Sequence, residues 1–202
     1  MWNTSKFSST GFMVVAATLM MCASALAHVG DGAAGGFLSG FGHPFSGWDH
    51  ILAMVAVGLW GAQLGPPAIW LLPITFPLMM AFGGFLGLIG APLPGVEIGI
   101  AGSAVVLGVA VALEAQPPVW VCMAVVGVFA LFHGHAHGTE LEPGADALAY
   151  SLGFVVATGL LHAIGIAIGI VRRWKLGEWG VQGMGVAVSI AGLVLLMGAV
   201  TR

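Results

Sequence analysis

Two separate stretches of the sequence combine histidines with carboxylates at spacings that could hold a transition-metal ion. Residues 43–50 read HPFSGWDH, and residues 132–140 read FHGHAHGTE. Imidazole nitrogens and carboxylate oxygens are ligands for divalent ions such as Ni²⁺, Co²⁺, Cu²⁺ and Zn²⁺. Burying such groups in apolar surroundings costs free energy unless they are paired or bind a metal. Because both stretches adjoin long apolar runs, we treat them as candidate metal-binding motifs.

The first motif contains His43, Asp49 and His50. Pro44 suits the first position of a helix, which predicts that a helix begins beside His43. Along such a helix, His43 and His50 lie two turns apart and within about 20° of the same face. Asp49 lies on the adjacent face, where it could bind the ion or orient a histidine through its second ring nitrogen. The alternative is that His43 only caps the helix.

The second motif places His133, His137 and Glu140 at positions i, i+4 and i+7. If the helix continues through the motif, these three side chains share one face, and His135 points elsewhere. The two glycines of the motif could instead break the helix and change which side chains converge. The alternative is a polar loop beyond the membrane that has no function.

Other ionisable residues are weaker candidates for a metal-binding site. Glu97 and Asp146 each open an apolar segment, where the helix dipole alone would stabilise a carboxylate. His28 could chelate a metal through its imidazole and a free amine if cleavage makes it the N-terminal residue. His162 and Glu114 lie toward the inner ends of their segments and could form an exit site. The alternatives are that His162 is a hydrogen-bonded residue of the core and that Glu114 is a charge at the membrane interface.

The composition predicts an integral membrane protein. Of the 202 residues, 59% are hydrophobic and 6% are charged, and the mean hydropathy is +1.05. A soluble domain has about 25% charged residues, so this chain could not cover a surface that faces water. No basic cluster is large enough to suggest a nucleic-acid partner. Cys122 is the one cysteine after residue 27, which excludes an internal disulfide or a thiolate metal cluster there.

Residues 1–27 have the pattern of a cleaved signal peptide, with an uncleaved signal anchor as the alternative. Lys6 precedes an apolar run at 11–21, and Ala25-Leu26-Ala27 forms a small-residue cleavage site directly before His28. Residues 28–202 then form one all-α membrane domain, a bundle of six transmembrane helices. The predicted spans cover about residues 43–64, 68–90, 96–115, 118–134, 145–171 and 181–200.

Two arguments give the same orientation in the membrane. A cleaved signal peptide leaves residue 28 outside the cytoplasm, and six spans return the C-terminus to that side. The loop 172–180 is then cytoplasmic, and its Arg172, Arg173 and Lys175 agree with the positive-inside rule. Both histidine motifs consequently lie on the outer side of the bundle.

At these motifs the sequence resembles the HupE/UreJ family of nickel permeases, over the whole chain after residue 27. The matching elements are His43-Pro44-x-x-Gly47-x-Asp49-His50-x-x-x-Met54 and Phe132-His133-Gly134-x-Ala136-His137-Gly138-x-Glu140, with weaker matches at Val96-Glu97-x-Gly99-Ile100 and Thr158-x-Leu160-Leu161-His162. The resemblance implies that the metal is handled by His43, Asp49, His50, His133, His137 and Glu140. It carries over less firmly to Glu97 and His162.

The resemblance implies uptake of Ni²⁺, or of Co²⁺, across the bacterial inner membrane to supply nickel enzymes such as hydrogenase or urease. Such a protein is not an enzyme and has no tightly bound cofactor. Its partners are a divalent metal ion and the lipid bilayer, and homo-oligomers or downstream metallochaperones stay open. The residues do not fix the ion, because mixed nitrogen and oxygen ligands also accept Cu²⁺ and Zn²⁺. An intramembrane zinc-dependent hydrolase is the alternative function, and a metal sensor or accessory subunit is a third.

Capture of a metal by histidines makes uptake depend on the external pH. We expect uptake to weaken as this pH falls below about 6, near the ordinary histidine pKa, because a protonated imidazole cannot bind metal. Uptake of labelled metal measured between about pH 7.5 and 5.5 tests this expectation. A flat profile would count against capture by histidines.

Overall fold

The computed structural model describes residues 36–141 and 146–201, and the described residues are almost entirely helical, as the sequence predicts. The predicted signal peptide and His28 lie outside these residues. The elements in chain order are α2 (Phe37–Gly42), the 3₁₀ helix η1 (His43–Phe45), α3 (Trp48–Leu64), α4 (Ala68–Leu88), α5 (Val96–Ala112), α6 (Val119–Glu140), α7 (Ala147–Ile170), the 3₁₀ helix η2 (Val171–Arg173) and α8 (Lys175–Val200).

The six long helices, α3 to α8, fall close to the six predicted spans. Within the described residues, four helical segments are long and apolar enough to cross a membrane: α4, α6, α7 with η2, and α8. Helix α5 is also apolar but shorter, with 17 residues. These segments identify a multi-pass membrane protein.

Three helix ends differ by several residues from the ends of the predicted spans. Helix α3 begins after Gly47, which has an extended backbone (φ −115°, ψ 128°), so the first helix does not start near residue 43. Helix α6 continues to Glu140 instead of ending at residue 134. Helix α8 begins at Lys175, because only Trp174 is extended (φ −107°, ψ 146°) in the stretch predicted as a loop at 172–180. The other predicted ends differ by a few residues, as is usual for helix termini.

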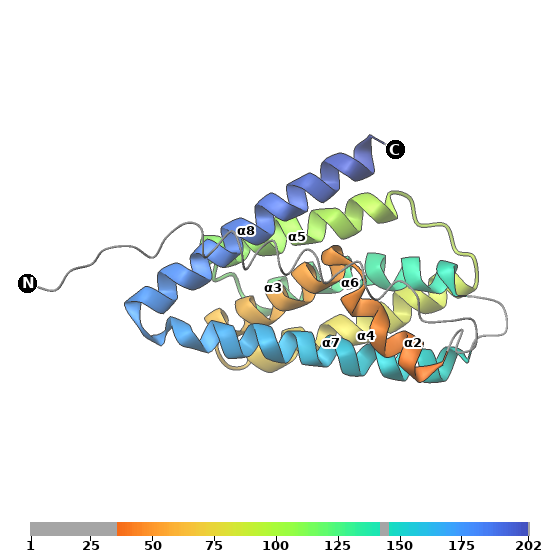
Figure 1. Ribbon diagram of the computed structural model, residues 1–202, viewed down its shortest axis with the longest axis horizontal. Coiled ribbons are helices and arrows are strands. Elements are labelled where there is room, and N and C mark those ends of the chain that lie inside the picture. The colour runs from red at the N-terminus through yellow and green to blue at the C-terminus, as the bar shows by residue number, and fades with distance from the viewer. Residues whose placement is uncertain (1–35, 142–145, 202) are drawn as a thin grey trace, which may run out of the picture. The chain divides into compact units, whose positions relative to one another are not determined.

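Close helix pairs form the framework, with α4 against α6, α5 against α8 and α3 against α7 (Figure 1). Glycines make the first pair possible. A Cβ atom on Gly134 of α6 would collide with the carbonyl oxygen of Met80 in α4, and one on Gly83 would collide with that of Leu131. Glycines in membrane helices allow such backbone contacts. The glycines that made a helix over 132–140 doubtful are therefore packing positions of a continuous helix.

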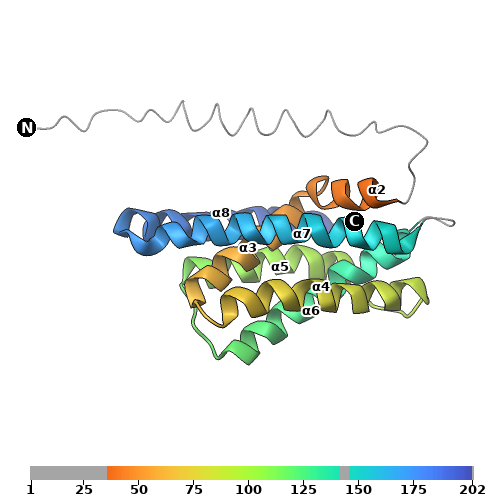
Figure 2. The ribbon, with the colours of Figure 1, turned by 90° about the horizontal axis from the view of Figure 1, so that it is seen from below.

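Helix α3 runs through the interior of the bundle, and His50 near its start is already buried. Ala53, Met54, Ala56, Val57 and Leu59 of this helix have no exposed surface. The short helix α2 packs against α7 (Figure 2), so that η1, which follows α2, is held beside the same region. His43 on η1 and His50 on α3 thus reach the same region of the bundle from two different segments of the chain.

A test of this packing compares two glycine-to-alanine substitutions in helices. Gly134→Ala should lower the free energy of unfolding by about 1–3 kcal/mol, because α4 and α6 must separate. Gly159→Ala should be neutral or slightly stabilising, since a Cβ there meets nothing within 4 Å and alanine favours the helix. Thermal unfolding of both purified variants in detergent gives the comparison. Equal midpoints would contradict the role given to Gly134.

Candidate metal centre

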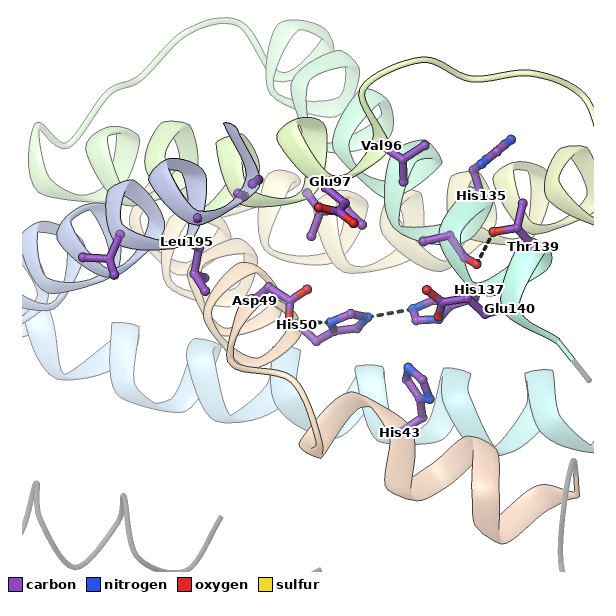
Figure 3. Close-up of a pocket in the computed structure, with 16 residues that line it drawn as sticks. His43, Asp49, His50, Val96, Glu97, His135, His137, Thr139, Glu140 and Leu195 are labelled. Atoms are coloured by element: carbon purple, nitrogen blue, oxygen red, sulfur yellow. Dashed lines mark hydrogen bonds and ion pairs between the residues drawn. The ribbon is translucent and has the colours of Figure 1, made fainter. Parts of the chain in front are cut away.

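Three histidines from three elements meet in one cluster. His43 of η1, His50 of α3 and His137 of α6 each offer a ligand atom, and these atoms lie within 4.8 Å of one another. The Nε2 atoms of His50 and His137 are 2.7 Å apart, and the rings of His43 and His137 have centroids 4.6 Å apart. Figure 3 shows the three rings turned toward a common point. Small movements of these side chains would let all three nitrogens bind one ion.

His43 and His50 come together through a break in the chain and not along one helix. The 3₁₀ helix at 43–45 closes with the hydroxyl of Ser46 donating to the carbonyl oxygen of His43 at 2.6 Å. Gly47 then turns the chain into α3. A Cβ on Gly47 would collide with Oδ1 of Asp49, so glycine here leaves room for the polar side chains. The expectation that both histidines share a helix face is wrong, although the pair it selected does converge.

Asp49 sits beside the cluster and pairs with one of its members. Its Oδ1 atom lies 3.0 Å from Nδ1 of His50, and Figure 3 shows the other ring nitrogen of His50 facing His137. A carboxylate in this position keeps the proton of the imidazole on Nδ1 and leaves Nε2 free to bind a metal. Asp49 therefore lies where the orienting role, one of the two roles expected for it, would require it.

The second motif divides into residues with different surroundings. His133 is fully buried one turn deeper than His137, and its ring lies against His50 with centroids 5.3 Å apart. Its Nδ1 donates to the carbonyl oxygen of Phe129 at 2.9 Å. His135 is also buried, but its Nε2 donates to the carbonyl oxygen of Ala91 at 2.7 Å. His135 thus has a structural bond and lies outside the three-histidine cluster, as its helix position predicts.

A cavity of about 560 Å³ opens beside the cluster and carries further carboxylates. Glu97 at the start of α5 and Glu140 at the end of α6 both line it, together with the three histidines and Asp49 (Figure 3). Both glutamates are exposed. Carboxylates at the mouth of a cavity raise the local concentration of cations. Neither belongs to the compact three-histidine group.

Aromatic residues that the sequence analysis did not select pack around the imidazoles. The ring of Phe154 lies 4.6 Å from that of His137, and Tyr150 lies 6.0 Å from His43, measured between centroids. Both belong to α7, four residues apart. Phe76 of α4 contacts His133 at 5.6 Å. The spacing of Tyr150 and Phe154 was visible in the sequence, but which helix they would face was not.

The predicted exit site is not formed. Glu114 instead pairs with Arg172, whose Nη2 lies 3.3 Å from the carboxylate, and Arg172 also donates to the carbonyl oxygen of Gln63. His162 is buried at 1% exposure, with its ring 5.4 Å from that of Phe76. The structure therefore gives Glu114 and His162 different neighbours, and Glu114 forms an ion pair with Arg172.

Burial affects the protonation of His43, which lies before the first long helix. Loss of water lowers its pKa, the neighbouring His50 acts in the same direction, and Asp49 opposes both. A lowered pKa keeps this imidazole neutral to a lower pH than a free histidine. Competition from protons at His43 therefore sets in below the pH at which an exposed histidine would lose its metal.

Replacing the orienting carboxylate should weaken metal binding without removing a nitrogen ligand. We expect Asp49→Asn to lower the affinity for Ni²⁺ by about 10–100-fold, because His50 loses the charge that fixes its tautomer. Asp146→Asn is the matched control, since Asp146 caps α7 by accepting from the amide of Ala149. Calorimetric titration of both variants in detergent gives the two affinities. The same affinity in both would rule out this role for Asp49.

Comparisons with known proteins agree with the motifs. The family described as HupE / UreJ protein matches residues 15–195. The protein named HupE from Rhizobium leguminosarum bv. viciae is 48% identical over 182 residues, which cover 90% of this chain and 95% of that protein. No solved structure matches the chain. Neither match supports the zinc-dependent hydrolase alternative. The extent of the family match and the identity to this relative show that the chain belongs to the HupE/UreJ family.

Proposed function

We propose that this protein is a permease that takes up Ni²⁺ across the inner membrane of a bacterium to supply nickel enzymes such as hydrogenase or urease. The observation that carries the proposal is the convergence of His43, His50 and His137 within 4.8 Å inside a bundle of apolar helices. Membership in a family associated with nickel and cobalt transport favours Ni²⁺ or Co²⁺ over Cu²⁺ and Zn²⁺, which three imidazoles would also accept.

The cavity suggests how the ion is captured. Glu97 and Glu140, exposed at the mouth, attract the hydrated cation. The three imidazoles then replace part of its water, and Asp49 holds His50 in the tautomer that binds metal. Three neutral nitrogens leave coordination positions for water. A site with such incomplete ligation binds the ion and still allows it to leave, which transport requires.

The proposed orientation places this cluster on the outer side of the membrane. After removal of residues 1–27, six helices cross the bilayer and both termini lie outside. Arg172, Arg173 and Lys175 follow α7, and Arg172 bonds to Gln63 near the far end of α3 from the cluster. Basic residues at the end away from the cluster fit a cytoplasmic position for that end.

Two neighbouring histidines of the second motif allow a direct test of transport. His137→Ala should abolish uptake of Ni²⁺ into proteoliposomes, because the cluster loses a ligand. His135→Ala should retain most uptake, since His135 bonds to the backbone of Ala91 and not to the other histidines. Labelled Ni²⁺ is followed with this protein as the only protein in the vesicles, and Co²⁺, Cu²⁺ and Zn²⁺ are compared in the same assay.

Both variants are first shown to keep the helical content and thermal midpoint of the parent. A parent protein that moves no metal would refute the permease. A parent that transports while both variants lose uptake equally would refute the assignment of His137 as the specific ligand.

A further inference from the structure

We propose that a second metal-binding station lies deeper in the bundle, at His162 and Thr158, and that the ion reaches it from His133 past the ring of Phe76. These four residues are called the inner column. The inference rests on the proposed function, because it describes where an ion captured by the outer histidines goes next. It also replaces the exit site that the sequence suggested, since Glu114 has a different partner.

The inner column contains polar atoms that have no partner. His133, Thr158 and His162 are 0%, 0% and 1% exposed. Within the described residues, no hydrogen bond reaches Nε2 of His133, Oγ1 of Thr158 or either ring nitrogen of His162. An unsatisfied buried polar group costs about 1–3 kcal/mol, and native structures contain few of them. Several in one region indicate a group that they bind at some stage.

The tautomer of His133 suits metal binding. Its Nδ1 donates to the carbonyl oxygen of Phe129 at 2.9 Å, so Nδ1 carries the proton and Nε2 has a free lone pair. A histidine that binds a metal commonly donates its other N–H to a backbone carbonyl in this way. His162 keeps a lone pair on one nitrogen in either neutral tautomer. The imidazole of His162 and the hydroxyl of Thr158, one turn apart on α7, offer a nitrogen and an oxygen of the kinds that divalent transition metals accept.

A continuous series of ring contacts joins the outer cluster to this station. His50 contacts His133 at 5.3 Å, His133 contacts Phe76 at 5.6 Å, and Phe76 contacts His162 at 5.4 Å, measured between centroids. Thr158 lies one turn before His162 on the same face of α7. His162 is 15 residues along this helix, which corresponds to about 22 Å from its start.

The ion needs these ligands because most of the interior is apolar. Leu72 and Val126 are fully buried members of the hydrophobic core, and a divalent ion without ligands there would have a prohibitive desolvation cost. The aromatic face of Phe76 adds a weaker attraction for a cation. Because Phe76 contacts both imidazoles, movement of its ring is the step that would bring the ion from His133 to His162.

A thiol at position 162 reports directly whether a metal arrives there. We expect Co²⁺ added to the His162→Cys protein in detergent to give the near-ultraviolet charge-transfer absorption of a cobalt–thiolate bond. Ser189→Cys is the matched control, because Ser189 is a buried residue of α8 that bonds to Gly185 and Val105, away from the column. The parent, which retains Cys122, and the Ser189→Cys protein should lack this band.

Uptake in proteoliposomes separates the inner station from the outer cluster. His162→Leu should reduce Ni²⁺ uptake at least about tenfold while leaving the affinity of the outer cluster nearly unchanged, whereas His137→Ala should abolish both. Thr158→Val, which replaces the hydroxyl by a methyl of similar size, should slow uptake with a smaller effect. Helical content and thermal midpoint are checked for each variant.

The outcomes distinguish the two proposals. No thiolate band in the His162→Cys protein, or parental uptake by His162→Leu, would overturn the inner station and leave the permease intact. Absence of Ni²⁺ uptake by the parent would overturn the permease itself, whatever the cobalt spectra show. A thiolate band that also appears in the Ser189→Cys protein would overturn the station, because the ion would then be entering the bundle without following the column.

Discussion

The contact between His50 and His137 connects the packing of the helices with the chemistry of the candidate site. Their Nε2 atoms are 2.7 Å apart, so without a metal one of them must carry a proton that the other accepts. One ring belongs to the pair α3 and α7, and the other belongs to the pair α4 and α6. An ion that binds here takes the place of this shared proton. The two pairs meet where α3 packs against α4, and this contact brings the rings together in an apolar interior.

Local sequence periodicity was sufficient for some parts of the site. Spacing along α6 correctly separates His137 from His135, because the helix is regular through residue 140 and periodicity then fixes which way a side chain points. The sequence analysis also predicted that His43 and His50 lie close together, but it placed both on one helix, whereas α3 begins after His43. The extended backbone at Gly47 is what brings the two histidines together. In the sequence, the glycine indicated this change of direction only indirectly.

The parts that sequence reasoning missed depend on which helices are neighbours. Phe76 and Phe154 look like ordinary apolar residues of their helices, and only the packing of α4 and α7 against the histidines gives them their contacts. Glu114 was paired with the wrong residue, since nothing local shows that Arg172, 58 positions later, reaches it. A single sequence contains the periodicity of each helix, but it does not contain the order in which helices are packed.

The three ligands of the outer cluster are fixed to separate rigid parts, with His43 on the segment that follows α2, His50 on α3 and His137 on α6. The distances between their nitrogens therefore depend on how η1, α3 and α6 are held in the bundle, and backbone contacts such as that of Gly134 with Met80 hold α6 against α4. Ions with different preferred bond lengths and geometries would each require a slightly different spacing. If these histidines bind a metal, discrimination among ions would be a property of the whole bundle, and residues far from any histidine could alter it.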